Sequence, residues 1–249
     1  METYKQINLN DYVQTGEGGT SLTYTHKSRP ALAKLFNPGR EAEQAEHEFL
    51  MAQAVFQMGI PTPQPLQLIT DGKRQGVEYE LIAHKRSLTR IISEEPNRLE
   101  DVSLTFARMA RQLHATKADT KRLPSVKDAL RRFDQQKDLV SQEYKERALN
   151  FLDKAPDADT CVHGDMHIGN VITDGQRSDF LLHITPETLK AHWDIFLPAY
   201  LGTTDSAAID DYTKQLMPFY AVRVPYMLDV LTQGRLPQEA FKPLSQLIR

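Results

Sequence analysis

The chain has 249 residues, of which 40% are hydrophobic, so it can bury a substantial core as one large domain or as two lobes. Its 30 Lys and Arg residues against 33 Asp and Glu residues leave a formal net charge of -3, so no overall basic field indicates nucleic acid or an anionic membrane as a partner. The single cysteine, Cys161, excludes an intramolecular disulfide and a zinc site of several thiolates.

The first six residues are polar and lead into no apolar segment of the kind that a secretory signal needs. No run of about 18 apolar residues occurs anywhere in the chain, so the sequence predicts no membrane-spanning helix. A lone cysteine also suits a reducing compartment. These features together predict a cytoplasmic protein with no nucleic-acid or membrane partner.

Short strands are expected over residues 12–36, interrupted by a stretch of small residues and Gly at residues 15–21. The strand that follows this stretch is predicted at residues 31–36. From residue 40 to residue 58 apolar side chains recur at helical spacing, and Gly59 stands where a helix C-cap is expected. The apolar stripe of this helix consists of Ala45, Phe49, Ala52 and Phe56.

The next segment, residues 60–65, contains three prolines and is not expected to be helical. Residues 66–70 and 76–82 look like strands, and the turn Asp71-Gly72-Lys73 joins them. The N-terminal part of the chain is therefore predicted to be a small sheet with one main helix.

The pattern becomes mainly helical beyond residue 85. Apolar side chains at helical spacing predict a helix over residues 102–113 and another over residues 129–152, and helices predominate again after residue 190. The sequence thus predicts an α+β fold with two lobes: a sheet-rich lobe over residues 1–84 and a larger helical lobe over residues 85–249. A ligand is expected between the two lobes.

The segment most informative about chemistry is His163-Gly164-Asp165-Met166-His167-Ile168-Gly169-Asn170, which precedes an apolar, strand-like run. In it an Asp and an Asn are five residues apart. An aspartate can orient and deprotonate an attacking hydroxyl group, and an Asn that returns on the same loop can offer its carbonyl oxygen to Mg²⁺. Asp165 and Asn170 are therefore candidates for phosphoryl transfer.

Two other interpretations of this segment stay open. In the first, the segment is an ordinary turn in which the side chains of His163 and Asn170 cap backbone groups. In the second, His163, Asp165 and His167 hold a zinc or iron ion, because imidazole and carboxylate groups are ligands of both metals. No additional ligand at helical spacing completes such a site.

This segment resembles the H-G-D-x-x-x-x-N catalytic loop of the aminoglycoside phosphotransferase and choline kinase-like family, whose members are relatives of protein kinases. The order and spacing of other segments agree with the family over roughly residues 12–200. The resemblance implies a bilobal, protein-kinase-like fold, ATP and Mg²⁺ as cofactors, and Asp165 as the catalytic residue.

The resemblance also implies a set of nucleotide-binding residues. Lys34, on the strand after the small-residue stretch, is expected to reach the α- and β-phosphates of ATP. Adenine is expected against the linker, where Glu80, Leu81, Ile82 and Ala83 supply backbone hydrogen bonds. The phosphate-covering loop would consist of Gly16, Gly18, Gly19, Thr20 and Ser21.

A helix glutamate should hold Lys34, and the choice falls among Glu41, Glu43, Glu46 and Glu48. Glu48 lies three residues after Ala45 and four before Ala52, beside the apolar stripe that must face the sheet. We therefore expect Glu48 to pair with Lys34. Two further matches to the family, His114 after a helical Leu and Asp194 as a brace for the catalytic loop, are expected to be structural.

The sequence departs from the family at the second metal-binding aspartate. That residue is expected about a dozen positions beyond the loop Asn, which points to Leu182 or His183, and neither is a carboxylate. Asp179 comes only nine residues after Asn170. Three explanations stay open: a shortened hairpin that makes Asp179 the metal ligand, His183 as a substitute ligand, or loss of the metal carboxylate.

Two functions follow from these expectations. One is an ATP-dependent phosphotransferase that transfers the γ-phosphate to a small hydroxyl-bearing molecule; the short stretch between Ile184 and His192 leaves little room for the activation segment of a protein kinase. The other is a catalytically degenerate kinase-like protein that binds a nucleotide or a partner. Acidic residues near the C-terminus would attract a cationic acceptor such as an aminoglycoside or choline, or are ordinary solvated helix charges: Asp205, Asp210 and Asp211.

Overall fold

The computed structural model describes residues 3–18, 20–38, 42–131, 139–164, 166–173, 185–232 and 237–248. The chain divides into two compact units. The strand unit comprises Met1–Arg98, Lys121–Leu123 and Asp165–Ile184. The helical unit comprises Leu99–Thr120, Pro124–Gly164 and Thr185–Arg249. The α+β class predicted from the sequence is confirmed, whereas the predicted lobes of residues 1–84 and 85–249 stay a prediction.

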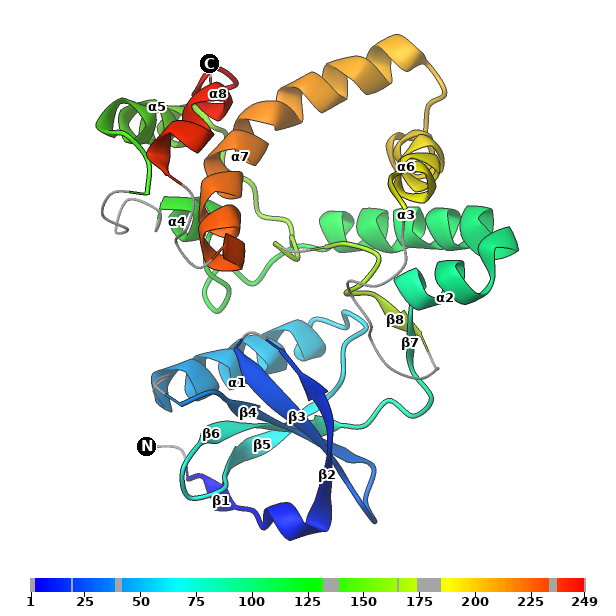
Figure 1. The fold of residues 1–249 in the computed structure, drawn as a ribbon, viewed down its shortest axis with the longest axis vertical. Helices are drawn as coiled ribbons and strands as arrows, with labels where there is room; N and C mark the ends of the chain where they lie inside the picture. Colours follow the sequence, from blue (N-terminus) through cyan, green and yellow to red (C-terminus); the bar gives the residue numbers. More distant parts are fainter. Residues whose placement is uncertain are drawn as a thin grey trace. The chain divides into compact units, whose positions relative to one another are not determined.

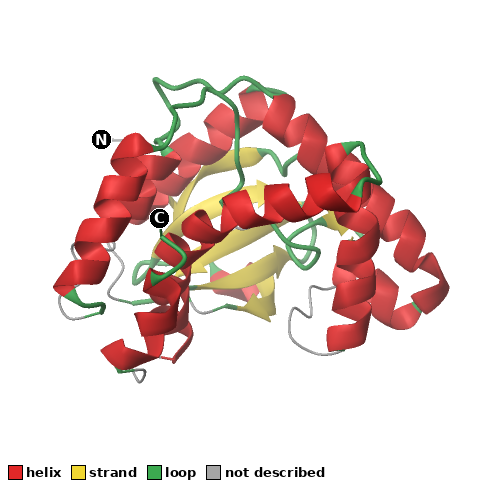
Figure 2. Cartoon of the chain, turned by 90° about the horizontal axis from the view of Figure 1, so that it is seen from above, coloured by secondary structure: helices red, strands yellow, loops and turns green. Residues whose placement is uncertain are grey.

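The strand unit is built on a six-stranded sheet with the order β1-β5-β6-β4-β3-β2 (Figures 1 and 2). β1 runs parallel to β5, and all other neighbours are antiparallel. A short 3₁₀-helix, η1 (Leu9–Asp11), leads into β2. The strands are β1 (Lys5–Gln6), β2 (Tyr12–Glu17), β3 (Ser21–His26), β4 (Ala31–Phe36), β5 (Pro65–Thr70) and β6 (Gln75–Glu80).

The predicted strands agree well with those observed. The strand predicted at residues 31–36 is β4, and the predicted turn at Asp71-Gly72-Lys73 joins β5 to β6. The prediction of an interruption over residues 15–21 was too wide, because β2 continues to Glu17 and β3 begins at Ser21. A tight hairpin satisfies the backbone with fewer irregular residues than composition suggests.

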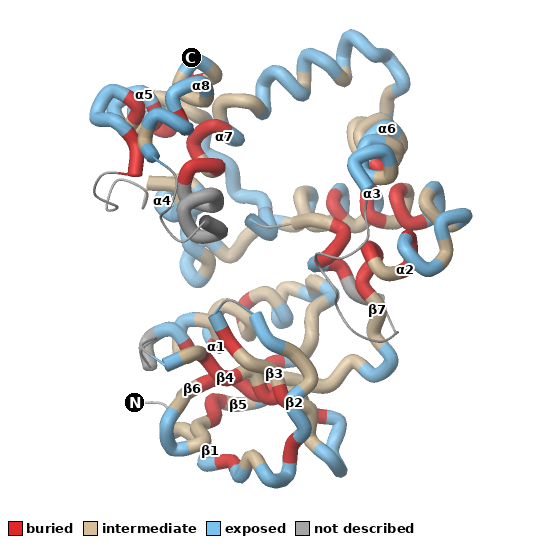
Figure 3. Tube along the Cα trace, viewed as in Figure 1, coloured by how far each residue is buried: buried red, intermediate tan, exposed pale blue. Residues whose placement is uncertain are grey.

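Helix α1 (Ala42–Gln57) covers one face of the sheet by packing on β5 and β6. Phe49 and Ala45 of this helix join Phe36, Leu68 and Val77 of the sheet in one buried cluster. The opposite face of the sheet is lined by a second cluster, which consists of Ile7, Tyr12, Tyr24, Ala33, Leu35 and Ile69. Because both faces of the sheet are covered, its central strands are buried, as Figure 3 shows.

The helix predicted over residues 40–58 is confirmed, and it ends before Gly59, whose φ is 75°. One part of its predicted stripe is wrong: the side chain of Phe56 is 39% exposed, while Ala54 is fully buried. The last turn thus presents a small residue to its neighbours and leaves the large one at the surface.

A second, smaller part of the strand unit follows the sheet. β7 (Arg86–Ser87) pairs antiparallel with β8 (Ile172–Thr173), and α2 (Leu88–Glu94) starts directly after β7. The short η2 (Pro96–Arg98) ends this part. The two-residue strands place the start of α2 beside the chain that follows the His163–Asn170 segment.

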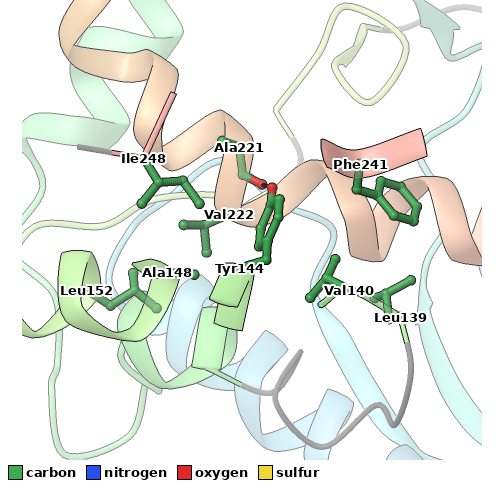
Figure 4. Packing of buried hydrophobic residues seen from close by; sticks show 9 residues of the cluster. All are labelled: Leu139, Val140, Tyr144, Ala148, Leu152, Ala221, Val222, Phe241 and Ile248. Atoms are coloured by element: carbon green, nitrogen blue, oxygen red, sulfur yellow. Dashed lines mark hydrogen bonds between the residues drawn. The ribbon is translucent and has the colours of Figure 1, made fainter. Parts of the chain in front are cut away.

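The helical unit contains two packed groups. In one, α3 (Leu99–Ala115) packs against α6 (Pro186–Leu201), with Phe106 and Phe196 5.0 Å apart between ring centroids. The other forms around Tyr144, whose hydroxyl group donates to the carbonyl of Ala221 at 2.6 Å (Figure 4). The remaining helices are α4 (Val126–Arg131), α5 (Gln142–Lys154), α7 (Ser206–Thr232), η4 (Gln238–Phe241) and α8 (Lys242–Ser245).

The single helix predicted over residues 129–152 is wrong, because α4 ends at Arg131 and α5 starts at Gln142. Residues 139–141 between them are not helical. Ser141 explains the start of α5, since its side chain accepts a hydrogen bond from the N–H of Tyr144 and caps the helix. The spacing of apolar residues alone does not reveal such a cap.

Helix α7 carries Pro218 and Pro225 inside its span, and it changes direction along its length (Figure 1). Each proline lacks the N–H group that the helix ladder needs, which accounts for bending. Within the described ranges, no helix is both long and apolar enough to cross a membrane.

Candidate functional site

The centre of the candidate site is an ion pair between β4 and α1. Lys34 Nζ lies 2.8 Å from Oε1 and 2.7 Å from Oε2 of Glu48. Both side chains are partly exposed, at 29% and 27%. The pairing of Lys34 with a helix glutamate, which the resemblance implies and for which helical spacing selected Glu48, is therefore present in the structure.

Tyr79 of β6 completes this group, and the sequence analysis did not single it out. Its hydroxyl group donates to Glu48 Oε1 at 2.8 Å. Burial, together with the negative charge and hydrogen bond of Glu48, raises the pKa of Tyr79 well above its usual value. The hydroxyl group thus stays protonated and remains a donor at neutral pH.

The register of the sheet brings the start of the predicted phosphate-covering loop into line with Lys34. Gly16 of β2 faces Thr23 of β3, which in turn faces Lys34 of β4. A Cβ atom on residue 16 would lie 2.5 Å from the side-chain oxygen of Thr23. Packing inside the sheet therefore explains the glycine at position 16 without any ligand.

Only a short part of the predicted loop is a turn. The N–H of Gly18 donates to the carbonyl of Ser21 at 2.9 Å, and the N–H of Asn37 donates to the carbonyl of Thr20 at 3.0 Å. Ser21 is buried in β3, and Gly19 lies outside the described residues. Because the N–H of Gly18 is already engaged, it is not free to bind a phosphate in this conformation.

Gly76 is a second residue that the sequence analysis missed. It lies on β6 beside the strand that carries Lys34, and a Cβ atom at this position would overlap the carbonyl oxygen of Lys34. The glycine therefore permits the close approach of β6 to β4.

The loop that contains Asn170 is anchored by the start of α2. The N–H of Leu88 donates to the carbonyl of Val171 at 3.0 Å, and the N–H of Thr89 donates to the carbonyl of Ile168 at 3.2 Å. These two carbonyls flank Asn170 in sequence, and Asn170 itself is exposed. The first N–H groups of α2, which have no partner within the helix, are thus used to hold this loop.

The predicted linker follows β6 directly. The N–H of Glu80 donates to the carbonyl of Gln64, and the N–H of Leu81 donates to the carbonyl of Pro30. These two groups are therefore occupied, which leaves Ile82 and Ala83 as the candidates in this segment for hydrogen bonds to adenine. Their role in binding stays a prediction.

Several predicted site residues lie outside the described residues: the catalytic candidate Asp165, the metal candidate Asp179, Gly19 of the loop, and both Leu182 and His183. The alternative metal site that includes Asp165 lies partly outside them too. Among the side chains that the structure describes, no group of three or more His, Cys, Asp or Glu residues is arranged to hold a metal ion. Asn170, the other predicted metal ligand, is among the described residues and is exposed, and its role in a Mg²⁺ site stays a prediction.

The two residues expected to be structural make contacts within the helical unit. Nδ1 of His114 lies 2.8 Å from the hydroxyl group of Tyr200. Burial lowers the pKa of His114. Asp194 is 60% exposed and forms an ion pair with Lys190 at 2.5 Å, one turn earlier in α6. Its predicted role as a brace for the catalytic loop stays a prediction.

A cavity of about 340 Å³ in the helical unit lies among Arg111, His114, Ala115, Tyr200, Leu201 and Tyr212. Burial, aided by a hydrogen bond that Tyr212 donates to Tyr200, raises the pKa of Tyr212 to about 12. Nδ1 of His114 lies 2.8 Å from the hydroxyl group of Tyr200 in this lining. None of the predicted nucleotide-binding residues lines it.

Comparison with known proteins agrees with this geometry. The family model described as "Phosphotransferase enzyme family" matches residues 12–180, more than half of the chain. The search of curated proteins finds no match. Since the family model covers both the Lys34–Glu48 pair and the His163–Asn170 segment, the chain belongs to the phosphotransferase enzyme family.

Solved structures of small-molecule kinases share the fold. The gentamicin complex of APH(2")-IIa is 14% identical, covers 95% of this chain and 91% of its own, and has a TM-score of 0.52. The ADP-bound aminoglycoside phosphotransferase APH(2'')-Ib is 15% identical over 96% and 91% of the two chains, with a TM-score of 0.51. An ethanolamine kinase of Plasmodium vivax is 14% identical over 96% and 80%, with a TM-score of 0.50.

Proposed function

We propose that this protein is an ATP-dependent phosphotransferase that transfers the γ-phosphate of ATP to a small hydroxyl-bearing molecule. The observation that carries the proposal is the Lys34–Glu48 ion pair. A lysine that is held by a helix carboxylate and still exposed to solvent is suited to bind the phosphates of a nucleotide. The pair belongs to the same compact unit as Asn170.

Each site residue has a role in this proposal. Lys34 binds the α- and β-phosphates, the hairpin from Gly16 to Ser21 covers them, and Ile82 and Ala83 hold adenine through their backbone. Asn170 and Asp179 are the residues that would hold Mg²⁺, which when bound neutralises charge on the phosphates.

Asp165 is the proposed catalytic residue. Its carboxylate orients the acceptor hydroxyl group and takes the proton as the acceptor oxygen bonds to the γ-phosphorus. The bond between the γ-phosphorus and the β–γ bridging oxygen breaks, and ADP leaves with that oxygen. Most of the rate enhancement would come from positioning and electrostatics, because the chain needs to form no covalent intermediate.

The alternative is a catalytically degenerate protein that binds a nucleotide or a partner. A specific observation favours it: Leu182 and His183 stand where the second metal carboxylate is expected. Loss of that carboxylate would remove a charged Mg²⁺ ligand from a site whose catalysis depends on charge. Nucleotide binding would survive while transfer would not.

The acceptor is proposed to be a cationic molecule with a hydroxyl group. Among the proteins of similar fold, one is bound to gentamicin and another is an ethanolamine kinase, and both compounds carry amino and hydroxyl groups. The acidic side chains of Asp205, Asp210 and Asp211 are exposed and would favour such a molecule electrostatically.

The test is a titration of the full chain with ATP, with and without Mg²⁺, in which thermal stability and phosphate transfer to gentamicin or ethanolamine are followed. The variants are Asp165→Ala and, as a matched control, Asp128→Ala, which removes a carboxylate that is 70% exposed from α4. We expect transfer in the wild type and the control, and loss of transfer without loss of ATP binding in Asp165→Ala. ATP binding without turnover in the wild type would support the degenerate protein. No ATP binding would overturn both the phosphotransferase and the degenerate protein that binds a nucleotide.

A further inference from the structure

The carboxylate of Glu48 bridges two neighbouring strands of the sheet. Its Oε1 atom accepts from Lys34 of β4 and from the hydroxyl group of Tyr79 of β6, both at 2.8 Å, and its Oε2 atom accepts from Lys34 alone. We propose that Tyr79 is a positioning residue that fixes Glu48, and through Glu48 the ammonium group of Lys34, for nucleotide binding. The inference rests on the proposed function and adds a residue to its site.

The register of the sheet explains why one carboxylate can reach both donors. Lys34 faces Val77, and Leu32 faces Tyr79, so Lys34 and Tyr79 occupy diagonal positions on the same face of two antiparallel strands. Helix α1 covers this face. Glu48 of α1 therefore lies above both Lys34 and Tyr79, and its carboxylate can accept hydrogen bonds from side chains of both strands.

The chemistry of Tyr79 suits this role better than that of a second cation. A lysine or arginine at this position would compete with Lys34 for the negative charge of Glu48. A phenol donates one hydrogen bond and leaves that charge to Lys34. Because the ring of Tyr79 also packs against the buried cluster under α1, its hydroxyl group is held in one place.

The consequence for Lys34 is geometric. A lysine side chain is a flexible stem of four carbons, so an ammonium group that is not held samples many positions. Both oxygens of Glu48 lie within hydrogen-bond distance of Nζ, at 2.8 and 2.7 Å, so the orientation of that carboxylate sets the position of the ammonium group. Removing the hydroxyl group of Tyr79 lets the carboxylate rotate, and the ammonium group follows it away from the phosphates.

The same sheet provides a matched control. Tyr12 donates to Oε1 of Glu78 at 2.9 Å, and Glu78 lies on β6 next to Tyr79, with its side chain on the opposite face. Tyr79→Phe and Tyr12→Phe thus each remove one hydroxyl group and one hydrogen bond to a carboxylate, and both keep the ring. Only the first change touches the Lys34–Glu48 pair.

The experiment measures the Kd of ATP by calorimetric titration, and the KM for ATP and kcat wherever turnover is found. We expect Tyr79→Phe to weaken ATP binding about five- to tenfold, the size of one lost hydrogen bond, and to raise the KM for ATP while the KM for the acceptor stays the same. Tyr12→Phe should lower thermal stability about as much as Tyr79→Phe does. It should change the Kd of ATP less than about twofold.

A further pair of variants tests whether Tyr79 acts through Glu48. In a Glu48→Ala background, Tyr79→Phe should have no additional effect on the Kd of ATP. Wild-type affinity in Tyr79→Phe, an equal loss in Tyr12→Phe, or an additive loss in the Glu48→Ala background would overturn the inference while the proposed function stands. A wild type that binds no ATP would overturn the proposed function, and the inference with it.

Discussion

At the scale of single residues, Glu78 illustrates what a buried carboxylate requires from its neighbours. It is 1% exposed and accepts from Tyr12 at 2.9 Å, Arg29 at 2.8 Å and Gln67 at 2.5 Å. Burial raises the pKa of Glu78, but the hydrogen bonds and the charge of Arg29 outweigh burial and lower the pKa on balance. The carboxylate is therefore charged and fully engaged in the folded protein.

We predict that Glu78→Ala lowers the free energy of unfolding by about 2–3 kcal/mol, because it leaves the three donors without their acceptor. The value is at the lower end for a buried ion pair, since Arg29 is 44% exposed and water can replace part of the interaction. Urea denaturation at pH 7 measures the loss. The stabilisation of the wild type should be present above the pKa of the unfolded carboxyl group, 4.5, and should disappear as the pH falls through the lower folded value.

His192 is a second buried ionisable residue, and it lies in the helical unit. Ser103 donates to the carbonyl of Leu99 at 2.6 Å, so Nδ1 of His192, 2.8 Å from the hydroxyl oxygen of Ser103, must act as the donor to it. His192 is 2% exposed and packs against the rings of Phe106 and Phe196. Burial lowers its pKa below 6.5, which favours the neutral ring in the folded protein.

This shift has a definite sign for stability. As the pH falls below about 6.5, the unfolded chain takes up a proton that the folded chain resists, so the free energy of unfolding should decrease until the folded pKa is reached. We predict that His192→Gln reduces the difference in stability between pH 7.5 and pH 5.5, measured by urea denaturation. The control is His47→Gln, which replaces an exposed histidine of α1. An unchanged pH dependence in His192→Gln would contradict the assignment.

At the scale of elements, the cap of α2 connects a helix to the candidate catalytic loop. Ser87 is fully buried and accepts from the N–H of Arg90 at 3.1 Å. The two preceding N–H groups of the helix, those of Leu88 and Thr89, hold the carbonyls of Val171 and Ile168. The geometry of the first turn of α2 therefore sets the position of the backbone on either side of Asn170.

We predict that Ser87→Ala lowers stability by about 1–2 kcal/mol, the usual effect of losing a helix cap. The change should also increase amide hydrogen exchange of residues 166–173. The matched control is Ser141→Ala, which removes the equivalent cap of α5 in the other unit. It should cost a similar free energy and leave exchange in residues 166–173 as it is in the wild type. Equal exchange in both variants would contradict the proposed link between α2 and the loop.

The elements also show which parts of the fold are visible in the sequence. β4 and α1 were predicted because their apolar patterns are local and strong. The family resemblance supplied the pairing of Lys34 with a helix glutamate, and helical spacing selected Glu48 for it. β1 was missed because a two-residue strand has no pattern of its own and forms by parallel pairing with distant β5. Tyr79 was missed for a related reason, since its partner lies on α1 and only the register of the sheet brings them together.

At the scale of the whole molecule, the described residues with proposed nucleotide roles, including Lys34, Glu48 and Asn170, all belong to the strand unit. The helical unit has its own buried cluster and its own polar contacts, such as that between Ser103 and His192. A ligand that binds only the folded chain stabilises it according to its concentration and affinity. ATP should therefore stabilise the folded protein by binding to the strand unit.

We predict that ATP at about 100 times its Kd stabilises the protein by about 2.7 kcal/mol, which raises Tm by roughly 5–10 °C for a chain of this size. Mg²⁺ should add to this increase only if the chain still supplies a second metal ligand. Differential scanning fluorimetry of wild type, Asp179→Ala and His183→Ala, each with ATP in the presence and absence of Mg²⁺, separates the three explanations for the displaced carboxylate. Asp174→Ala, a change in the same segment, is the control.

A Mg²⁺-dependent increase that disappears only in Asp179→Ala would establish the shortened hairpin, because the carboxylate nine residues after Asn170 would then be the charged ligand. An increase that disappears only in His183→Ala would identify an imidazole as the substitute. If Mg²⁺ adds nothing in the wild type while ATP alone raises Tm, the metal carboxylate has been lost and the degenerate protein is the correct interpretation. An increase that survives both substitutions would contradict all three explanations, since the second ligand would then lie elsewhere in the chain.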